Sequence, residues 1–405
     1  MSLLDLITSE SEWKKFYGYK TGLAVEKRFA KDLESFIAEK RYIAVGEIIK
    51  NNDPFPLPRK AVISKMSSLK KRTVYIYPGD ENIVLKFLTY KLIRRYDHLF
   101  SPNLYSFRAG TSAKEAIRNL VSVRGIREMY AYKVDISNYF NSIPIDRLIP
   151  ELKEVLSDDP ELAEFLTSLL EVPYVIDSNG GLITEQKGIM AGSPQASFYA
   201  NLYLRELDRW FQTLGIPYAR YSDDIIVFAP TREECEAHAS FIREQLISHG
   251  LTINPDKEAF FTPEEGFIFL GFSYRAGVVD IAPASIAKIK AKMRRKARAL
   301  KRWKDRRNKG PDNAAAAFIR VFNRKLYISE GELDDNELSW SKWYFPVINT
   351  AESLRVIDRY AQDCVRYIMS GKRNKSRFRV TYQDMKELGL KSLVHSYYAY
   401  EEDLS

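Results

Sequence analysis

Two short segments of the chain carry carboxylates in a setting where carboxylates are unusual. Asp223 and Asp224 are adjacent and are followed at once by four apolar residues, 225–228, which predict a buried strand. Asp135 ends another short β-type run. Adjacent carboxylates beside a buried strand repel each other and lose hydration, so they need a cation. Divalent magnesium takes hard oxygen ligands of this kind together with substrate phosphates. The pattern therefore predicts a metal site.

The alternative for each carboxylate is a structural role. Asp158-Asp159 and Asp334-Asp335 are also acidic doublets, but they stand in polar settings typical of helix caps and loops. Asp135 alone would be read as a strand-end cap. Beside the Asp223-Asp224 doublet, it completes a set that suits a two-metal site. In such a site one ion activates an attacking hydroxyl and the other stabilises the leaving phosphate.

The sequence also indicates, in outline, the elements that must position these carboxylates. The doublet lies between two strand-like segments, as at the tip of a hairpin, and Asp135 would come from a neighbouring strand. Residues 1–60 show helical spacing, interrupted at 51–58 by three prolines. Residues 60–280 mix short strands with helices, and 283–405 are mostly helical. The expected class is α+β.

Composition excludes several kinds of protein. The chain has 405 residues, with 62 Lys and Arg against 53 Asp and Glu, a net charge of +9. No run of 18 apolar residues is present, so no membrane-spanning helix is expected. Asp5 stands where a signal peptide would be positively charged. Two cysteines, Cys235 and Cys364, give neither a zinc cluster nor a disulfide framework. A cytoplasmic location is expected.

Positive charge is concentrated in one segment. Residues 288–309 hold 13 Lys and Arg and one acid, a net charge of +12, so the rest of the chain carries −3. Ile286, Ile289, Met293, Ala297 and Leu300 form one apolar stripe at helical spacing, opposite a basic face. A solvated face or a membrane-surface helix is possible. Contact with a phosphate backbone is favoured, because solvated faces normally mix both signs of charge.

The order of the motifs resembles that of reverse transcriptases, especially the bacterial group II intron, retron and phage-defence branch. The resemblance runs from about residue 60 to 275 and depends on seven motifs in the correct order. In chain order they are Lys70-Lys71-Arg72, residues 105–112, Asp135-Ile136-Ser137-Asn138-Tyr139-Phe140, residues 188–204, Tyr221-Ser222-Asp223-Asp224, residues 251–257 and Phe269-Leu270-Gly271-Phe272.

This resemblance implies a right-hand polymerase with fingers, an antiparallel-sheet palm and a helical thumb. The expected parts are a helical extension (1–59), interleaved fingers and palm (60–282), and a basic thumb with a tail (283–405). Asp135, Asp223, Asp224 and the backbone carbonyl of Ile136 would hold two Mg²⁺ ions, for which Mn²⁺ could substitute. Lys257 is a candidate to protonate the leaving pyrophosphate. An ordinary turn lysine is its alternative.

The resemblance also implies the residues that handle nucleotide and nucleic acid. Phe140 would be a sugar gate that excludes ribonucleotides, with plain core as its alternative. Ala191 stands where the intron and retroviral enzymes usually carry Gln, which favours a divergent branch. The remaining nucleotide-binding candidates are Lys65, Lys71, Arg72 and Gly192. Those for nucleic acid are Arg108, Leu270, Gly271, Lys292, Arg295, Arg298, Arg302, Lys372 and Arg373.

The expected activity is RNA-directed DNA synthesis in bacterial anti-phage defence. The expected partners are an RNA template (a structured non-coding RNA from the same locus), a primer or product duplex and deoxynucleotides, with no membrane. The alternatives are a retron or intron-type reverse transcriptase or maturase, an RNA-dependent RNA polymerase, and a basic scaffold without chemistry. The four scattered histidines show no zinc-finger or His-Asn-His nuclease.

Overall fold

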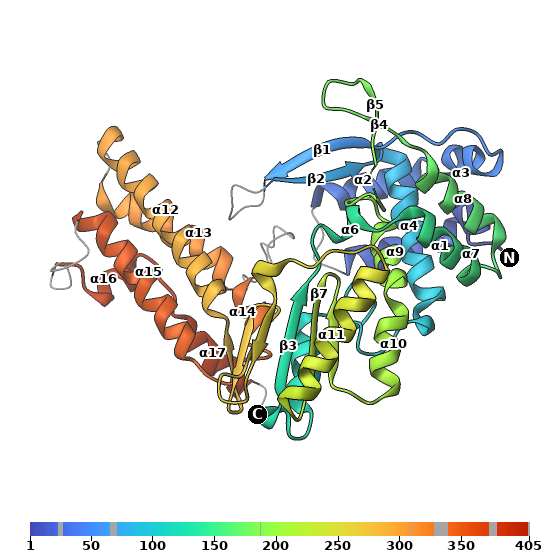
Figure 1. Ribbon diagram of the computed structural model, residues 1–405. Coiled ribbons are helices and arrows are strands. Elements are labelled where there is room, and N and C mark those ends of the chain that lie inside the picture. The colour runs from blue at the N-terminus through green and yellow to red at the C-terminus, as the bar shows by residue number, and fades with distance from the viewer. Residues whose placement is uncertain are drawn as a thin grey trace. The chain divides into compact units, whose positions relative to one another are not determined.

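The computed structural model describes residues 1–22, 27–64, 71–186, 188–308, 310–327, 339–371 and 379–403. Among the candidates, Lys65, Lys372, Arg373 and the side chain of Lys71 lie outside the described residues. The chain divides into two compact units, 1–262 and 263–405 (Figure 1). Each is described by itself.

The first unit begins with a helical layer around Trp13. The Trp13 ring stacks on Phe87 with centroids 4.2 Å apart, and its Nε1 donates to the backbone oxygen of Ile7. The chain has no regular element at 53–58, as the prolines predict. The helices are η1 (Asp5–Thr8), α1 (Glu10–Thr21), α2 (Lys27–Ala38), α3 (Tyr42–Lys50), α4 (Gly79–Arg95) and η2 (Asp97–Leu99).

A four-stranded sheet follows, with the strand order β2-β1-β4-β5. Its strands are β1 (Arg59–Ser64), β2 (Lys71–Ile76), β4 (Tyr174–Ile176) and β5 (Leu182–Thr184). Strands β1 and β2 form the long antiparallel hairpin seen in Figure 1. Further helices follow η2 along the chain, before β5. They are α5 (Ala113–Ser122), η3 (Ile126–Glu128), α6 (Tyr139–Ser142), α7 (Ile145–Val155) and α8 (Pro160–Glu171). The side chain of Asp159 caps α8, the kind of role expected for that doublet.

The second sheet is antiparallel throughout, in the order β6-β7-β3-β8. Its strands are β3 (Tyr130–Asp135), β6 (Tyr218–Tyr221), β7 (Asp224–Ala229) and β8 (Ala259–Phe261). Residues 225–228 are at most 1% exposed, which confirms the buried strand. Helix α11 packs on β3 and β7 through a stripe at helical spacing, Cys235, Ala239, Ile242 and Leu246. The other helices near this sheet are α9 (Ala196–Tyr203), α10 (Arg205–Thr213), α11 (Arg232–Ser248) and η4 (Pro255–Lys257).

The second unit combines a small antiparallel sheet with helices. Leu270-Gly271 and Ala276-Gly277 form its two tight turns, and all four residues have positive φ, as type I′ turns require. Helices α12, α13 and α15 pack together in Figure 1. The elements are β9 (Phe267–Phe269), β10 (Phe272–Arg275), β11 (Val278–Ile281), α12 (Pro283–Arg307), α13 (Pro311–Leu326), α14 (Trp340–Tyr344), α15 (Glu352–Ser370), α16 (Tyr382–Glu387) and α17 (Leu393–Glu402).

The α+β class and the antiparallel sheet around the carboxylates are confirmed. In the described residues, no helix is long and apolar enough to cross a membrane. The boundary between the two units follows Thr262, so β9–β11 belong with the helices that come after them. The expected division into extension, fingers-palm and thumb stays a prediction.

Candidate active site

Three carboxylates meet at one end of the antiparallel sheet. Asp135 is the last residue of β3 and Asp224 the first of β7, and the two are paired in register. Asp223 lies with Ser222 in the two-residue turn between β6 and β7. Ser222 has a φ of 60°, whereas the φ of Asp223 is not positive, the pattern of a type II′ turn. The Ile136 N–H donates to the backbone oxygen of Asp223 at 3.1 Å, so the turn is tied to the end of β3.

The carboxylates are held where their charge is costly. Asp135 is 3% exposed. Burial, and next the charge of Asp135, raises the pKa of Asp223 above its ordinary value. Burial also raises the pKa of Asp224, to about 6, with further increases from Asp223 and Asp135. The site therefore concentrates negative charge that favours either protons or a cation.

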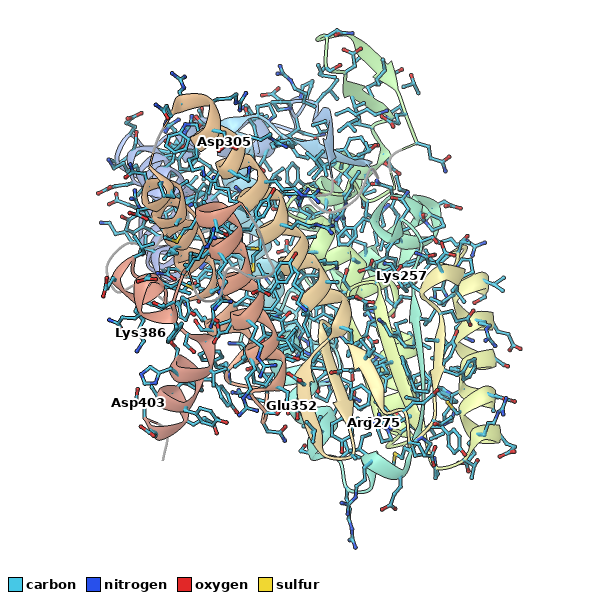
Figure 2. The ribbon with its side chains drawn as sticks, turned by 90° about the vertical axis from the view of Figure 1, so that its left-hand side faces the viewer. Lys257, Arg275, Asp305, Glu352, Lys386 and Asp403 are labelled. Atoms are coloured by element: carbon cyan, nitrogen blue, oxygen red, sulfur yellow. The ribbon has the colours of Figure 1, made fainter. Side chains whose placement is uncertain are left out.

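Two lysines lie beside these carboxylates. The Nζ of Lys257 donates a hydrogen bond to Oδ2 of Asp135, and the Nζ of Lys133 lies 4.0 Å from Oδ1 of Asp224. Burial lowers the pKa of Lys257, but the hydrogen bond with Asp135 outweighs it, so the pKa is raised. Lys257, which is labelled in Figure 2, thus lies next to Asp135, and its candidate role stays a prediction. Lys133 was missed, because a lysine inside a strand carries no signal by itself.

Asn254 is a second residue that sequence reasoning missed. Its N–H donates to the backbone oxygen of Asp135 at 2.8 Å, and its Nδ2 lies 3.4 Å from Oδ1 of Asp135. The Ser137 N–H likewise donates to the Thr252 oxygen at 2.8 Å. These bonds join segment 252–254 to the end of β3. They explain how Lys257, in the turn that follows, reaches Asp135.

The three aspartates are of the donor type that divalent metals bind, although they do not form a complete metal site by themselves. In the part of the chain that the structure describes, no group of three or more His, Cys, Asp or Glu side chains could hold a metal ion as it stands. The pKa values of Asp223 and Asp224 are raised, so a cation there would relieve the cost of their charge. Mg²⁺ is usually bound by one or two carboxylates, with the remaining positions left to water and substrate phosphates. By donor type the aspartates therefore fit Mg²⁺, as ligands of a site that substrate would complete.

Arg72 and Phe140 lie beside the carboxylates. The guanidinium carbon of Arg72 lies 5.8 Å from the centroid of the Phe140 ring, and its positive charge also acts on Asp223. Phe140 is half-buried and meets Phe107 edge to face at 6.0 Å. The ring of Phe140 is therefore packed yet still partly open to solvent. Both roles considered for it, gate and core, are compatible with this position.

The segment around Ala191 and Gly192 is held against strand β2. The Tyr75 N–H donates to the Ala191 oxygen at 2.8 Å, and the Ala191 N–H donates to Oδ1 of Asn141 at 3.1 Å. A Cβ on Gly192, whose φ is 102°, would lie 3.1 Å from the Tyr75 oxygen. The close approach that requires glycine here is thus to β2. Contact of Ala191 and Gly192 with a nucleotide stays a prediction.

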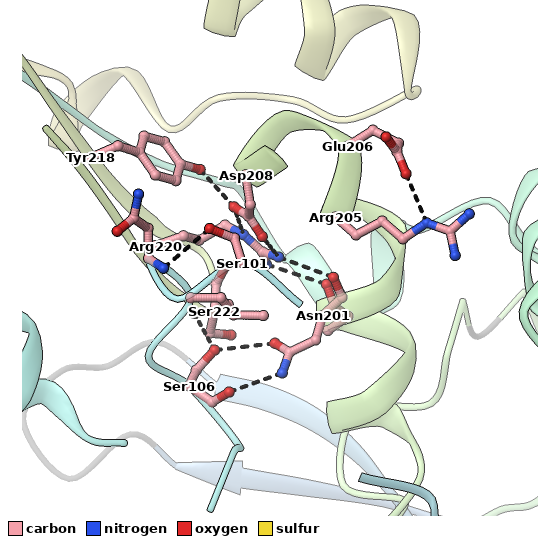
Figure 3. A network of polar contacts seen from close by, with 12 residues as sticks. Ser101, Ser106, Asn201, Arg205, Glu206, Asp208, Tyr218, Arg220 and Ser222 are labelled. Atoms are coloured by element: carbon pink, nitrogen blue, oxygen red, sulfur yellow. Dashed lines mark hydrogen bonds and ion pairs between the residues drawn. The ribbon is translucent and has the colours of Figure 1, made fainter. Parts of the chain in front are cut away.

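A buried ion pair lies directly before the β6–β7 turn (Figure 3). Arg220, on β6, is fully buried and donates to both carboxylate oxygens of Asp208 on α10, at 2.8 and 2.6 Å. The same guanidinium donates to the backbone oxygens of Ala200 and Asn201 at the end of α9. The last carbonyls of a helix lack partners within it and attract cations. Arg220 therefore fastens the strand that leads into the turn to two helices.

A second set of bonds in Figure 3 holds the turn itself. The Ser222 N–H donates to Oγ of Ser106 at 2.9 Å, and that hydroxyl bonds to Oδ1 of Asn201 at 3.2 Å. The Nδ2 of Asn201 returns to the Ser106 oxygen at 2.9 Å. Ser106 and Asn201 lie within motifs and Arg220 directly precedes one, but sequence reasoning gave them no role, because their partners lie in other elements.

The remaining candidates in the described residues belong to other elements of the two units. Arg108 is engaged inside the first unit, where its guanidinium binds both carboxylate oxygens of Asp97 and the Ser101 oxygen. In the second unit, Ile289, Met293 and Ala297 are buried, which confirms the apolar stripe of α12. Asp305, labelled in Figure 2, is its one acid. Along α12, Lys292 is half-buried and the three arginines are exposed: Arg295, Arg298 and Arg302.

Comparisons with known proteins give one family match and several distantly similar structures. A family model described as "Reverse transcriptase (RNA-dependent DNA polymerase)" matches residues 70–274. No curated protein sequence matches the chain. Among solved structures, apo telomerase from Candida tropicalis truncated from its C-terminal domain shares 13% identity at a TM-score of 0.46, over 56% of this chain and 55% of that one. The chain thus spans about half the length of that structure.

Two further telomerase structures are similar to a larger share of the chain. Telomerase from Candida tropicalis, in complex with a TWJ fragment of telomeric RNA, shares 11% identity at a TM-score of 0.49, over 87% of this chain and 65% of that one. The corresponding complex from Candida albicans shares 12% identity at a TM-score of 0.43, over 87% and 68% of the two chains.

Proposed function

Because the chain belongs to the reverse transcriptase family, we propose that it is an RNA-directed DNA polymerase that extends a primer by nucleotidyl transfer. The observation that carries the proposal is the in-register pairing of Asp135 with Asp224, with Asp223 in the adjoining turn. This arrangement collects three carboxylates at one end of a sheet and leaves the set open for substrate. A basic scaffold without chemistry would not need to bury Asp135.

Asp135, Asp223 and Asp224 would hold two Mg²⁺ ions, with Mn²⁺ as a substitute. When bound, the ions would lower the pKa of the primer hydroxyl and stabilise charge on the phosphates. The Ile136 carbonyl is a further candidate ligand. Lys257 donates a hydrogen bond to Asp135 and would pass a proton to the leaving pyrophosphate.

Arg72 and Phe140 would select and hold the incoming nucleotide. The Arg72 guanidinium presents paired donors that match phosphate oxygens, and it lies within reach of both Phe140 and the charge of Asp223. The partly exposed Phe140 ring would exclude a ribose 2′-hydroxyl by its bulk. Lys71 and Lys65 would add positive charge, and Ala191 and Gly192 would line the nucleotide.

We further propose that the template is a structured non-coding RNA and that the enzyme acts in bacterial anti-phage defence in the cytoplasm. The support is the motif set, in which Ala191 replaces the usual glutamine of intron and retroviral enzymes. Leu270, Gly271 and the basic face of α12 would contact the primer–template duplex, with Lys372 and Arg373 beyond them. Sequencing the RNA and DNA that co-purify with the protein would identify the template. Recovery of bulk RNA without cDNA would contradict this part of the proposal.

The activity is tested by incorporation of labelled deoxynucleotides on a primed RNA template with Mg²⁺. Asp223→Asn should reduce incorporation by about 10²- to 10³-fold, comparable with the loss of other preorganised catalytic groups. Asp32→Asn is the matched control, because Asp32 is an exposed acid on α2 and the change removes the same charge. Equal activity in the two variants would overturn the assignment of Asp223. No incorporation by the wild-type protein under any metal would overturn the polymerase itself.

Phe140→Ala separates DNA synthesis from RNA synthesis. If the ring is a gate, the ratio of ribonucleotide to deoxynucleotide incorporation should increase by about 10-fold or more, within the range for a single steric contact. The ratio is measured in competition at fixed template. An unchanged ratio would mean that Phe140 has only a structural role in the core. Wild-type preference for ribonucleotides would favour an RNA-dependent RNA polymerase instead.

A further inference from the structure

A cavity of about 320 Å³ lies in the first unit, outside the carboxylate site. Four segments line it: the end of α1, one face of α4, the loop at 107–109, and residues 194–197 at the start of α9. None of the motif roles given above uses α1 or α4. The cavity therefore needs its own explanation.

One wall of the cavity is positively charged. Lys86, Tyr90 and Arg94 recur at four-residue steps and so share one face of α4, and Lys20 approaches from α1. Burial lowers the pKa of Lys20, and the charges of Lys86 and Arg94 lower it further. These three cations repel one another and would be stabilised by an anion in the cavity.

The same wall carries aromatic rings. Tyr19 and Tyr90 lie with centroids 4.8 Å apart, and the Arg94 guanidinium lies 4.3 Å from the first and 3.8 Å from the second. An arginine that stacks on two tyrosines is held in a fixed orientation but keeps most of its donors available. Positive charge interleaved with aromatic faces is the composition of surfaces that bind single-stranded nucleic acid.

Phe107 connects the cavity to the candidate active site. It lines the cavity, is 42% exposed, and has a φ of 58°, a left-handed conformation that is unusual for a bulky residue. Its ring meets Phe140 edge to face, and Phe140 in turn lies beside Arg72. Arg108, which also lines the cavity, is bound to Asp97 and fixes the loop. Backbone strain of this kind persists where the surroundings enforce it and is frequent at functional sites.

We propose that this cavity binds the uncopied, single-stranded part of the nucleic-acid template as it approaches the active site. Phosphates would contact Lys20, Lys86 and Arg94, and a base would stack on Phe107. Such contacts are independent of sequence, as a polymerase template requires. The inference rests on the proposed function, because a primer–template substrate leaves unpaired template beyond the nucleotide being copied.

The test measures binding of a fluorescent primer–template duplex by anisotropy, without nucleotides. The duplex carries an RNA template overhang of either one or about six nucleotides, within the site size of single-strand binding proteins. The wild-type protein should bind the longer overhang about 10-fold more tightly. Lys20→Gln with Arg94→Gln should abolish most of this gain. Lys14→Gln with Arg28→Gln is the matched control, since both are exposed cations of the same unit.

Phe107→Ala divides the two kinds of contact. It should reduce the gain from the longer overhang while leaving the salt dependence of binding unchanged. The Lys20 and Arg94 double variant should also lower the slope of log Kd against log salt by about 1 to 2. A stacking ring and a phosphate clamp differ in this readout, whereas general damage to the fold would lower binding of both overhangs alike.

Several outcomes would overturn the proposal. These are a wild-type protein indifferent to overhang length, a double variant that keeps the gain, or an equal loss in the control. Binding of free ATP that the double variant loses, with no effect of overhang length, would make the cavity a free-nucleotide site. Failure of the wild-type protein to synthesise DNA would overturn the proposed function separately, because the overhang measurement needs no catalysis.

Discussion

The β6–β7 turn and helix α12 present charge in opposite ways. The turn places Asp223 and Asp224 at the end of a sheet whose strand β7 is almost fully buried. Helix α12 buries only a narrow stripe and exposes a series of arginines along 25 residues. Hydrogen bonds from side chains and backbone of three other segments hold the turn in place. Each arginine of α12, by contrast, has other basic residues as its neighbours along the helix.

This difference predicts how each region responds to the loss of a single side chain. At the turn, the Ser222 N–H and the Asp223 carbonyl have specific partners, as Arg220 before it does, and losing one partner leaves the other group buried without compensation. On α12, the net charge of residues 288–309 is +12, so the loss of one cation leaves most of the electrostatic field in place. Substitutions should therefore act sharply at the turn and gradually on the helix.

The largest effect is expected where the turn is fastened. Arg220→Met leaves Asp208 as a buried, unpaired carboxylate and should lower the free energy of unfolding by about 3–5 kcal/mol. Incorporation of deoxynucleotides should fall as well, because the strand before Asp223 loses its anchor. Denaturant unfolding and steady-state kinetics measure the two effects.

A double-mutant cycle gives the control. Arg220→Met with Asp208→Leu removes both charges and should recover part of the lost stability. Additive losses in the double variant would mean that the two side chains do not depend on each other. The contrast between a turn that depends on specific polar partners and a helix whose cations can replace one another would then lose its main support.

A smaller effect is expected at the carboxylates themselves. Burial raises the pKa of Asp224 to about 6, so the folded protein binds this proton more tightly than the unfolded chain does. The stability contributed by the proton is fully present below about pH 4 and is lost as the pH rises through about 6. Asp224→Asn should therefore stabilise the metal-free protein at pH 7 by roughly 1–3 kcal/mol, with little effect at pH 4.

Thermal unfolding in chelator at the two pH values measures this effect. Asp32→Asn, at an exposed acid of α2, is the matched control for the loss of one charge. Added Mg²⁺ should then stabilise the wild-type protein more than Asp224→Asn. Equal stability of wild type and Asp224→Asn at both pH values would mean that burying the charge of Asp224 does not lower the free energy of unfolding.

The smallest effect is expected for single cations of α12. Arg295→Gln should weaken duplex binding by only a few-fold and lower the salt slope by about 1, and Arg298→Gln and Arg302→Gln should add to it stepwise. Lys386→Gln, on α16 of the same unit, is the control. A collapse of binding on the first substitution would show that α12 contains a specific contact. An unchanged salt slope in the triple variant would mean that the basic face of α12 is only a solvated surface.

The sequence predicted the parts of the fold whose signals are local. The apolar run 225–228 indicated a buried strand, and the three prolines in 51–58 indicated a break in the helical lead-in. The stripe of α12 followed from three- and four-residue spacing. Each of these patterns reflects the partition of neighbouring side chains between core and water, so a short window contains the information.

Features that depend on distant partners were not predictable in this way. Asp208 looks like any helical acid, and only the fold places it against Arg220. The cavity lined by Lys20, Arg94 and Phe107 is assembled from four segments, and no one segment has an unusual composition. Gly192 was assigned to a nucleotide, whereas its close neighbour in the structure is β2.

The hydrogen bond from the Ser222 amide to Ser106 has a consequence for amide hydrogen exchange. The tip of a hairpin usually exchanges quickly, because it opens locally without disturbing the core. Ser222 is 6% exposed, and its N–H is donated to a hydroxyl that is itself buried. Its deuterium uptake should therefore be as slow as that of the central strands. The part of the molecule that we expect to perform the chemistry would then open only when the surrounding core opens.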